Sequence, residues 1–405
     1  MTDPGSAGFS VARLPRLEFG SGRISLLPEL IAEHGSHVLL VTGQSSFRGT
    51  AAWGRLLAEL DRRVIDHDDL VAVGEPSPGL VDGAVAMFRR RGIDVVAAVG
   101  GGSVLDTAKA VAGLLVPGNS VRDHLEGVGP ELPYRGPALP FLAAPTTAGT
   151  GSEATKNAVL SERGADGYKK SFRDERLVAA AAIVDPDLLA ACPAALVAAD
   201  GMDALTQLLE AFTSGRASPF TDALARSGLA AARDGLLAWH AAPDGPAAPA
   251  ARARMAYAAH LSGICLAQAG LGAVHGLASP LGAFFPIPHG VACGAVLVAA
   301  TRTNIAALEA RRSSPDATDR GLARYAEAGR LLADRPDLPD RKARQALLAE
   351  LERWAAELAV PRLAAFGVGP SDVARLVAAA RGSSMRTNPV ELSDPEVAAI
   401  VETSL

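Results

Sequence analysis

Four side chains in the second half of the chain have types and spacings that could hold a metal ion. The segment GMDALTQLLEAFTS carries Asp203 and, four residues later, Gln207 within an apolar helical pattern. Residues four apart lie on one face of a helix, so both can reach the same ion. A later segment, AVHGLASPLGAFFPIPHG, adds His275 and His289. A carboxylate and two imidazoles are ordinary metal ligands, whereas the neutral amide oxygen of glutamine is a weaker donor.

A glycine-rich turn in the first half of the chain suits an anionic ligand. The segment AVGGGSVLDTAK follows an apolar strand pattern and opens a helix. Gly101 and Gly102 let the backbone approach a ligand closely, and the N–H groups of the following helix then face an anion. Ser103 adds a hydroxyl donor. A pyrophosphate fits this turn, and the alternative is a tight strand-to-helix connection without a ligand.

A second turn, PTTAGTGSEAT, also follows a strand pattern and carries Thr146, Thr147 and Thr150. Open α/β sheets bind ligands at the carboxyl edge, where such turns lie. Two turns of this kind favour nucleotide binding, although neither is the usual G-x-G-x-x-G fingerprint.

The segments around these residues predict two domains. Short apolar runs such as HVLLVTG, IDVVAAVG and LVAAAAIV alternate with helical patterns, which predicts parallel βα units with both sheet faces covered. After Pro186, apolar residues recur at three- and four-residue spacing in helix after helix. We therefore expect an α/β domain over 1–186 and an all-helical domain over 187–405. The segment RRSSPDATDR, residues 311–320, is interpreted as an interhelical loop.

Composition limits the class of protein. A chain of 405 residues with 49% hydrophobic and 20% charged residues is typical of a folded globular protein with two domains. A net charge of −5 gives no sign of binding to nucleic acid or to a membrane surface. We find no apolar signal core at the N-terminus and no run of roughly 18 apolar residues. We therefore expect a soluble cytoplasmic protein.

Three cysteines, Cys192, Cys265 and Cys293, form no C-x-x-C pair. An odd number of cysteines does not build a disulfide framework. We interpret all three as reduced and mostly buried small apolar residues.

The motifs GGGSVLDTAK, PTTAGTGSE, DALT and H…PLG…PHG, in this order over roughly residues 15–390, resemble the iron-containing (group III) alcohol dehydrogenases. The resemblance implies an N-terminal dinucleotide-binding α/β domain and an all-α C-terminal domain. It also implies NAD(P)-dependent hydride transfer to or from a small alcohol, aldehyde or ketone in the cleft between them. We further expect a homodimer or a higher homo-oligomer.

The resemblance assigns dinucleotide contacts to two turns and a later strand. The glycine turn would hold the pyrophosphate, and the threonines would line the nicotinamide and ribose side. The residues implied are Gly101, Gly102, Ser103, Asp106, Thr146, Thr147, Thr150 and Lys170.

The loop after HVLLVT bears on the choice of nicotinamide cofactor. Family members that prefer NAD often carry an aspartate at the position of Gly43, where it binds the ribose 2′-OH. Here Ser45, Ser46 and Arg48 instead offer donors suited to a 2′-phosphate. We therefore favour NADP(H) over NAD(H). The alternative is that the serines cap a helix and Arg48 is a solvated surface charge.

In the resembling family an aspartate and three histidines hold Fe²⁺ or sometimes Zn²⁺. The matching residues are Asp203, Gln207, His275 and His289, so one histidine is replaced by glutamine. Ser279 stands where many members place a further histidine. Three outcomes stay open: a metal held by three strong ligands with Gln207 weak or outside the ligand set, a metal-free site in which a histidine and a water polarise the substrate, or an inactive site.

In both active cases Asp203, His275 and His289 form the predicted catalytic group. Three rival functions remain: a metal-free reductase similar to maleylacetate reductase, a lyase or cyclase similar to dehydroquinate synthase, and a nucleotide-binding protein without turnover. The glycine and threonine motifs fit the alcohol dehydrogenases better than maleylacetate reductase. The ligand pattern and the pocket lysines and arginines of dehydroquinate synthase are not found in this sequence. Turnover of an aldehyde panel separates a reductase from a lyase or a binding protein.

Overall fold

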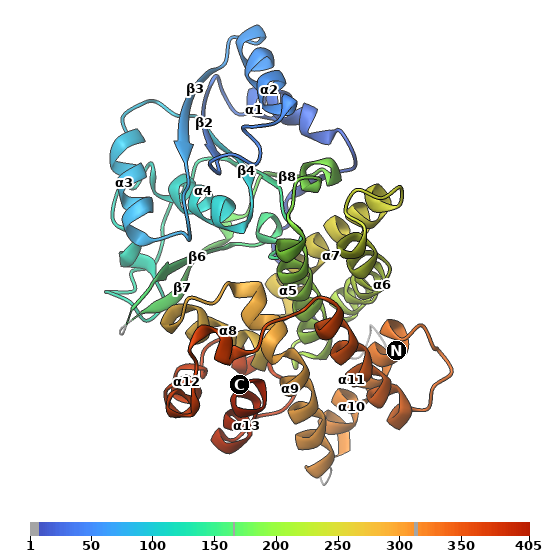
Figure 1. Ribbon diagram of the computed structural model, residues 1–405. Coiled ribbons are helices and arrows are strands. Elements are labelled where there is room, and N and C mark those ends of the chain that lie inside the picture. Colours follow the sequence, from blue (N-terminus) through green and yellow to red (C-terminus); the bar gives the residue numbers. More distant parts are fainter. Residues whose placement is uncertain (1–7, 165–166, 312–314) are drawn as a thin grey trace. The chain divides into compact units, whose positions relative to one another are not determined.

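Residues 8–164, 167–311 and 315–405 are described by a computed structural model, in which the chain divides into two units (Figure 1). One unit is formed by Ala12–Glu162 with Gly167–Cys192, and the other is built on Pro193–Leu405. The division falls after Cys192, whereas the sequence patterns place it after Pro186.

The first unit contains a six-stranded parallel sheet with the strand order β1-β8-β5-β4-β2-β3. This confirms the predicted parallel α/β arrangement. The strands are β1 (Arg16–Phe19), β2 (His37–Thr42), β3 (Asp66–Val71), β4 (Val95–Gly100), β5 (Phe141–Pro145) and β8 (Ala181–Val184). Every residue of β4, β5 and β8 is buried, as expected of strands covered on both faces.

Helices cover both faces of this sheet. They are α1 (Leu27–Ala32), α2 (Ala51–Arg62), α3 (Pro78–Phe88) and α4 (Gly102–Leu114). Successive side chains of a strand point to opposite faces. In β2, Val38 and Leu40 therefore pack in a core with residues of α1 and α2, while Leu39 and Val41 pack in a second core with residues of α3 and α4.

An antiparallel hairpin of β6 (Asn157–Glu162) and β7 (Tyr168–Arg173) was not expected from the sequence. It forms a separate two-stranded sheet, and β6 contacts α4. Its strands, NAVLSE and YKKSFR, carry many polar residues and lack the apolar run that marks the parallel strands. The apolar side chains Leu160 and Phe172 are nevertheless buried in the core with α4.

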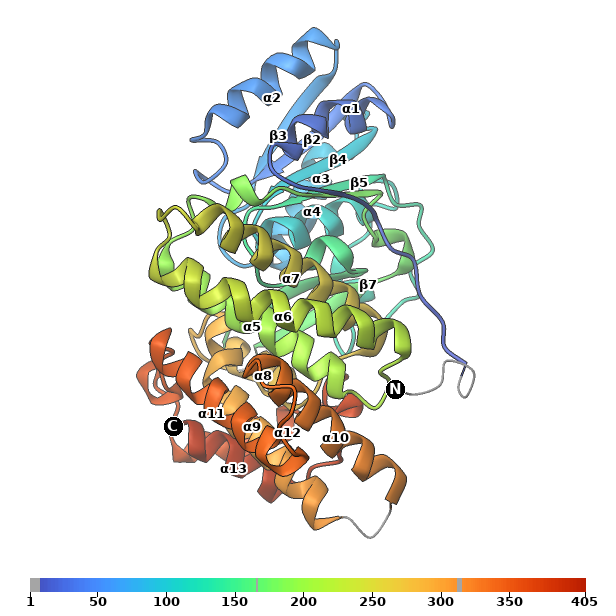
Figure 2. The same ribbon diagram turned by 90° about the vertical axis from the view of Figure 1, so that its right-hand side faces the viewer.

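In its described residues the second unit contains helices and no strand, which confirms the predicted all-α domain. Its helices are α5 (Ala194–Thr213), α6 (Pro219–Ala241), α7 (Ala248–Ala269), α8 (Ala273–Phe284), α9 (His289–Ala310), α10 (Pro315–Leu332), α11 (Asp340–Glu357), α12 (Val373–Ala379) and α13 (Asp394–Ser404). Helices α5, α6 and α7 lie side by side (Figure 2). The loop predicted over 311–320 is wrong from Pro315 onward, where α10 begins, and residues 312–314 lie outside the described residues.

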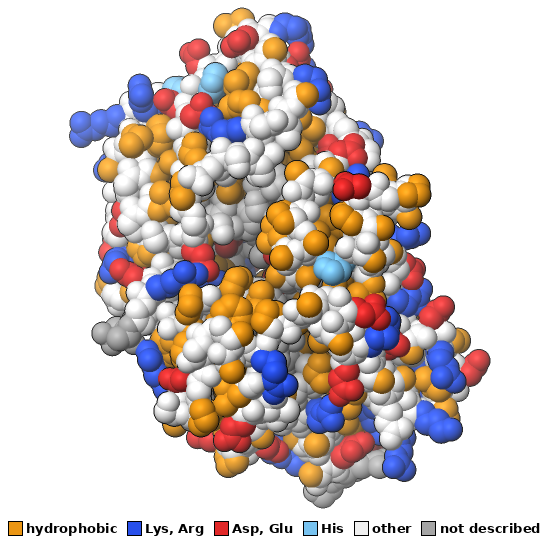
Figure 3. All heavy atoms as spheres, in the orientation of Figure 1, with side chains coloured by type: hydrophobic (Ala, Val, Ile, Leu, Met, Phe, Trp, Pro, Cys, Tyr) orange, Lys and Arg blue, Asp and Glu red, His pale blue; other side chains and the backbone are white. Residues whose placement is uncertain are grey.

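Helix α9 is long and apolar enough to cross a membrane, but 67% of its most apolar 18-residue stretch is buried inside the structure. Core helices of globular proteins can have the same length and composition. On the face shown in Figure 3, Lys and Arg side chains are scattered among Asp and Glu side chains. Such mixing of charges is typical of a solvated protein surface.

A buried lysine joins α4 to the segment that follows β5. The side chain of Lys109 is fully buried. Its Nζ donates hydrogen bonds to the carbonyl oxygen and Oγ of Ser152 at 2.8 and 2.9 Å, to Oγ1 of Thr155 at 3.1 Å and to the carbonyl oxygen of Asn157 at 2.7 Å. The ammonium group of Lys109 therefore holds the second polar turn, residues 145–155, against α4.

Asp106 belongs to the same buried network, which we call the Lys109 clasp. Its carboxylate accepts hydrogen bonds from Oγ of Ser152 at 2.5 Å and from the backbone N–H of Val159 at 3.1 Å, and lies 3.7 Å from Nζ of Lys109. Burial raises the pKa of Asp106 and lowers the pKa of Lys109, while each opposite charge counteracts the shift of the other. The carboxylate that the family resemblance assigned to the cofactor motif therefore binds groups of the protein itself.

We expect Lys109→Met to lower the free energy of unfolding by about 3–5 kcal/mol, because it leaves Asp106 buried without its partner. Urea unfolding followed by circular dichroism measures the change. Lys156→Met is the matched control, since Lys156 pairs with the exposed Glu175 at 2.5 Å; its cost should be about 1 kcal/mol or less. Equal effects of the two substitutions would contradict a structural role for the clasp.

Candidate metal and dinucleotide sites

The two polar turns predicted to bind a dinucleotide lie next to each other. Strands β4 and β5 are neighbours in register, and the backbone N–H of Thr146 donates to the carbonyl oxygen of Gly100 at 3.0 Å. A Cβ atom at Gly102 would lie 2.9 Å from Oγ1 and Cγ2 of Thr150, and one at Gly101 would lie 3.3 Å from Cγ2 of Thr147. The turns can pack this closely because both positions lack a side chain.

The amino end of α4 is suited to an anion. The helix begins at Gly102, and its N-cap residue, Gly101, supplies no side-chain acceptor. The first N–H groups of a helix have no partner within the helix, and the helix dipole makes this end positive. Ser103, in the first turn, is half-buried. These features fit the phosphates of a dinucleotide.

The remaining predicted cofactor residues lie on separate elements. Gly43 directly follows β2, and Ser45 and Ser46 are exposed in the next loop. Helix α2 has Thr50 at its N-cap position, so the two serines do not cap it. Lys170 lies in β7, where its Nζ is 3.6 Å from the position that a Cβ of Gly127 would take.

Arg48 is held beside the end of β2 rather than free in solvent. Its Nε donates to Oγ1 of Thr42 at 2.6 Å, and its Nη2 donates to the carboxylate of Asp69 at 2.7 Å. The guanidinium also lies over the ring of Trp53, 4.5 Å from the centroid. These contacts fix the cation close to Gly43.

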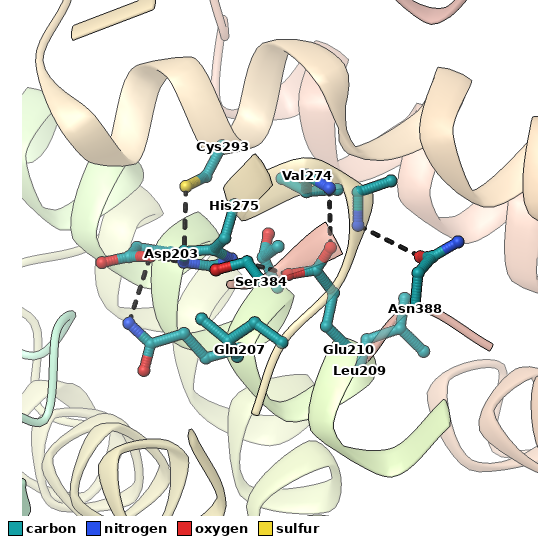
Figure 4. A network of polar contacts seen from close by, with 12 residues as sticks. Asp203, Gln207, Leu209, Glu210, Val274, His275, Cys293, Ser384 and Asn388 are labelled. Carbon is teal, nitrogen blue, oxygen red and sulfur yellow. Dashed lines mark hydrogen bonds and ion pairs between the residues drawn. The ribbon is translucent and has the colours of Figure 1, made fainter. Parts of the chain in front are cut away.

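In the helical unit, a group of four possible metal ligands converges from three helices. Asp203 comes from α5, His275 from α8, and His289 and Cys293 from α9, and their ligand atoms lie within 4.8 Å of one another. Oδ1 of Asp203 is 3.1 Å from Nε2 of His275 and 3.9 Å from Nε2 of His289. The structure thus brings together the three residues predicted to be catalytic (Figure 4 shows Asp203, His275 and Cys293).

Gln207 does not turn its oxygen toward this group. Its Nε2 donates to Oδ1 of Asp203 at 3.3 Å (Figure 4). Its Oε1 lies 2.9 Å from Oγ of Ser262, which also lies 2.7 Å from the carbonyl oxygen of Ala259. In this arrangement the amide oxygen, the atom able to bind a cation, points toward Ser262 and away from the group.

Glu210, which sequence reasoning missed, fixes the orientation of His275. Its carboxylate accepts from Nδ1 of His275 at 2.7 Å and from the backbone N–H of Val274 at 2.7 Å. Nε2 of His275 is thereby aimed at Asp203, in an arrangement common to metal-binding histidines. The sequence did hold a signal, since Glu210 follows Asp203 by two helical turns and shares its face.

Cys293 is buried, as expected, but it is not surrounded by apolar groups alone. Its Sγ lies 3.7 Å from Nε2 of His275 and 3.9 Å from Nε2 of His289. Burial raises the pKa of the thiol to about 11, against the effect of His275. Its spacing of four residues from His289 was the signal, once the segment is known to be helical.

The charges of the group favour an ionised Asp203. Burial would raise the pKa of this carboxyl, but the charge of His289 and the hydrogen bond from His275 outweigh burial and lower the pKa to about 2. Burial likewise opposes protonation of His275, whose pKa is nevertheless raised by Cys293 and by hydrogen bonds to Asp203 and Glu210. The carboxylates of Asp203 and Glu210 therefore favour a positive charge on the His275 ring.

Ser279 takes the place of a further family histidine. It is half-buried, and its Oγ donates to the carbonyl oxygen of His275 in the preceding turn of α8 at 3.3 Å. The short side chain bonds its own helix and supplies no imidazole to the group.

Comparison with known proteins assigns the chain to a family. A family model described as iron-containing alcohol dehydrogenase matches residues 15–186, and that family's C-terminal model matches residues 197–405. The chain belongs to the iron-containing alcohol dehydrogenase family. It is therefore an oxidoreductase acting on CH–OH groups, as its relatives are.

Individual relatives span nearly the whole chain. Long-chain-alcohol dehydrogenase 1 of Geobacillus thermodenitrificans is 34% identical over 98% of this chain and 97% of its own length. The crystal structure of a 1,3-propanediol oxidoreductase aligns with a TM-score of 0.84 and 29% identity over 98% of this chain and 100% of that chain. Sulfoacetaldehyde reductase from Bifidobacterium kashiwanohense, solved in complex with NAD⁺, aligns with a TM-score of 0.83 and 25% identity over 98% and 99% of the two chains.

We expect Glu210→Gln to weaken the binding of Zn²⁺ by roughly 10- to 100-fold, because the charge that orients and polarises His275 is lost. Calorimetric titration of metal-stripped protein with Zn²⁺ measures the affinity. Glu327→Gln is the control, since Glu327 pairs with Arg226 outside the group. Unchanged affinity in Glu210→Gln would show that this carboxylate has no role in metal binding.

Proposed function

We propose that this alcohol dehydrogenase transfers hydride between a nicotinamide dinucleotide and a small alcohol, aldehyde or ketone, with a divalent metal ion held by Asp203, His275 and His289. The observation that carries the proposal is the convergence of these three side chains from α5, α8 and α9. The two polar turns at the ends of β4 and β5 support dinucleotide binding in the same protein.

The donor atoms fit a metal ion. Ligand atoms about 2.0–2.3 Å from a tetrahedral ion lie roughly 3.3–3.8 Å apart. The separations between Asp203 and the two histidines, 3.1 and 3.9 Å, are close to this range. A buried, ionised carboxylate beside two imidazoles also supplies the charge and donor types that Fe²⁺ or Zn²⁺ accepts.

A bound divalent ion acts as a Lewis acid on the substrate oxygen. The chain's own residues prepare the site. Asp203 stays ionised, and Glu210 holds the Nδ1 proton of His275 so that Nε2 is presented to the pocket. His289 is the accessible member of the group, with 24% of its side chain exposed against 2% for Asp203. The turns after β4 and β5 hold the cofactor, which supplies the hydride chemistry.

Family membership favours this oxidoreductase over a dehydroquinate synthase-like lyase and over a nucleotide-binding protein without turnover. The metal-free reductase, similar to maleylacetate reductase, differs in its metal content. Metal analysis of the purified protein therefore separates that alternative from the proposal.

We further infer that the protein is cytoplasmic and forms a homodimer or a higher homo-oligomer.

We expect His289→Ala to lower kcat/KM for aldehyde reduction by roughly 100-fold or more, the effect typical of losing a group that stabilises charge in the transition state. The absorbance of reduced nicotinamide, followed with a panel of aldehydes and ketones, gives the rates. His240→Ala, at the end of α6 and outside the group, should keep the wild-type value. A fully active His289→Ala enzyme would remove His289 from the mechanism.

For the cofactor we propose NADP(H) in preference to NAD(H). No acid stands at Gly43 to repel a 2′-phosphate, and Arg48 is held near this position by Thr42 and Asp69. The nearest atoms to a Cβ at Gly43 would be Cγ2 of Val104 at 3.8 Å and Oγ of Ser46 at 3.9 Å. A side chain therefore fits there without strain.

We expect Gly43→Asp to raise KM for NADPH by about 10-fold or more through charge repulsion, while KM for NADH stays equal or falls. Steady-state kinetics with both cofactors measure the change. Gly43→Asn, which has the same size without the charge, separates repulsion from steric effects. If the wild-type enzyme already prefers NADH, the preference proposed here is wrong.

A further inference from the structure

Cys293 stands in the same geometric relation to the two histidines as a metal ligand would. Its Sγ is 3.7 Å from Nε2 of His275 and 3.9 Å from Nε2 of His289. The first distance falls within the separation of roughly 3.3–3.8 Å between the ligands of a tetrahedral ion, and the second lies just above it. The imidazole nitrogens that face Asp203 are the same ones that face the sulfur, and all four donor atoms lie within 4.8 Å of one another.

Backbone packing fixes this arrangement. Glycines follow His289 and Cys293 directly in α9. A Cβ at Gly290 would lie 2.2 Å from the carbonyl oxygen of Ala199, and one at Gly294 would lie 3.3 Å from Cβ of Met202. Both contacted residues belong to α5. The two helices therefore approach with little side chain between them, which brings the ligand-bearing face of α9 up to α5.

The position left by the replaced histidine is not filled by Gln207. Its oxygen accepts from Ser262, and its nitrogen donates to Asp203. An amide N–H cannot bind a cation. Gln207 instead supports the carboxylate of Asp203 from outside the ligand set, as groups around metal ligands commonly do.

We propose that the thiolate of Cys293 is the fourth protein ligand of the metal ion, beside Asp203 and the two histidines. The inference rests on the metal-dependent function proposed above. It makes the site one of mixed oxygen, nitrogen and sulfur donors. Since thiolates favour softer ions, the site prefers Zn²⁺ to the Fe²⁺ for which the family is named.

The charges of the four ligands match those of a divalent ion. Metal binding displaces the thiol proton, and the Nε2 proton of a charged histidine, to solvent, so Cys293 and Asp203 each contribute one negative charge. Together these two ligands neutralise a divalent ion, while the imidazoles bind as neutral donors and Glu210 adds one further negative charge outside the ligand set. This neutrality matters because the side chains of Asp203 and Cys293 are almost completely buried.

Titration of metal-free protein with Co²⁺, a spectroscopic substitute for Zn²⁺, tests the assignment. A cobalt–thiolate bond gives an intense charge-transfer band in the near ultraviolet, whereas carboxylate, imidazole and amide ligands do not. We expect this band to saturate at one Co²⁺ per chain and to vanish in Cys293→Ser. We also expect the Zn²⁺ affinity of that variant to fall by about 10-fold or more.

Cys265→Ser is the matched control, because Cys265 is buried in α7 with its Sγ 3.7 Å from the carbonyl oxygen of Thr221, outside the group. It should keep the band. X-ray absorption of the zinc-loaded wild-type protein is independent of the folding of any variant, and should show a sulfur neighbour at about 2.3 Å.

Co²⁺ binding without the charge-transfer band, or a band that persists in Cys293→Ser, would overturn the assignment of Cys293 while leaving the proposed metal-dependent function intact. A wild-type protein that binds neither Co²⁺ nor Zn²⁺ would overturn both. A zinc-loaded protein with only oxygen and nitrogen neighbours would likewise exclude the thiolate.

Discussion

The helical unit contains a buried negative charge that must be balanced. Asp203 has 2% of its side chain exposed, yet its carboxyl stays ionised. A buried carboxylate is stable only when hydrogen-bond donors or cations surround it. His275, His289 and the amide nitrogen of Gln207 all face it. Much of the site therefore consists of groups that stabilise the negative charge of the Asp203 carboxylate.

The α/β unit contains a buried positive charge. Lys109 is a buried cation, and four oxygen atoms of the protein surround its ammonium group. That charge is satisfied internally, so it serves to hold two turns together. The group around Asp203 contains two carboxylates instead, since Glu210 lies on the other side of His275. In the proposed metal site a divalent ion would balance this negative charge, whereas Lys109 needs no ion from outside.

The sequence predicted the features that depend on local pattern. The apolar runs predicted the parallel sheet. The glycines and threonines that follow two of these runs predicted a pair of polar turns, and Gly102 and Thr150 bring these turns into contact. Asp203, His275 and His289 were found by matching the chain to the ligand pattern of the resembling family. Their residue types alone are equally compatible with hydrogen-bonded core side chains. The hairpin β6–β7 was missed because strands such as YKKSFR lack an apolar run.

Cys293 and Glu210 were missed for a different reason. Helix α9 is apolar and buried around most of its surface, so its sequence gives no polar face from which the direction of Cys293 could be read. Glu210 lies on the same face of α5 as Asp203. Its role depends on contacts with the backbone of Val274 and the ring of His275, which are distant in the sequence. Contacts between remote segments decide both roles.

The contact between α5 and α9 also sets how closely His289 and Cys293 approach Asp203. At Gly290 the backbone of α5 is so close that no side chain can be added, so this end of the gap is fixed. At Gly294 an added methyl group would lie 3.2 Å from Cγ1 of Val360 and 3.3 Å from Cβ of Met202, so this position has slightly more room. A side chain at Gly290 would therefore push α9 away from α5 and carry His289 and Cys293 away from Asp203.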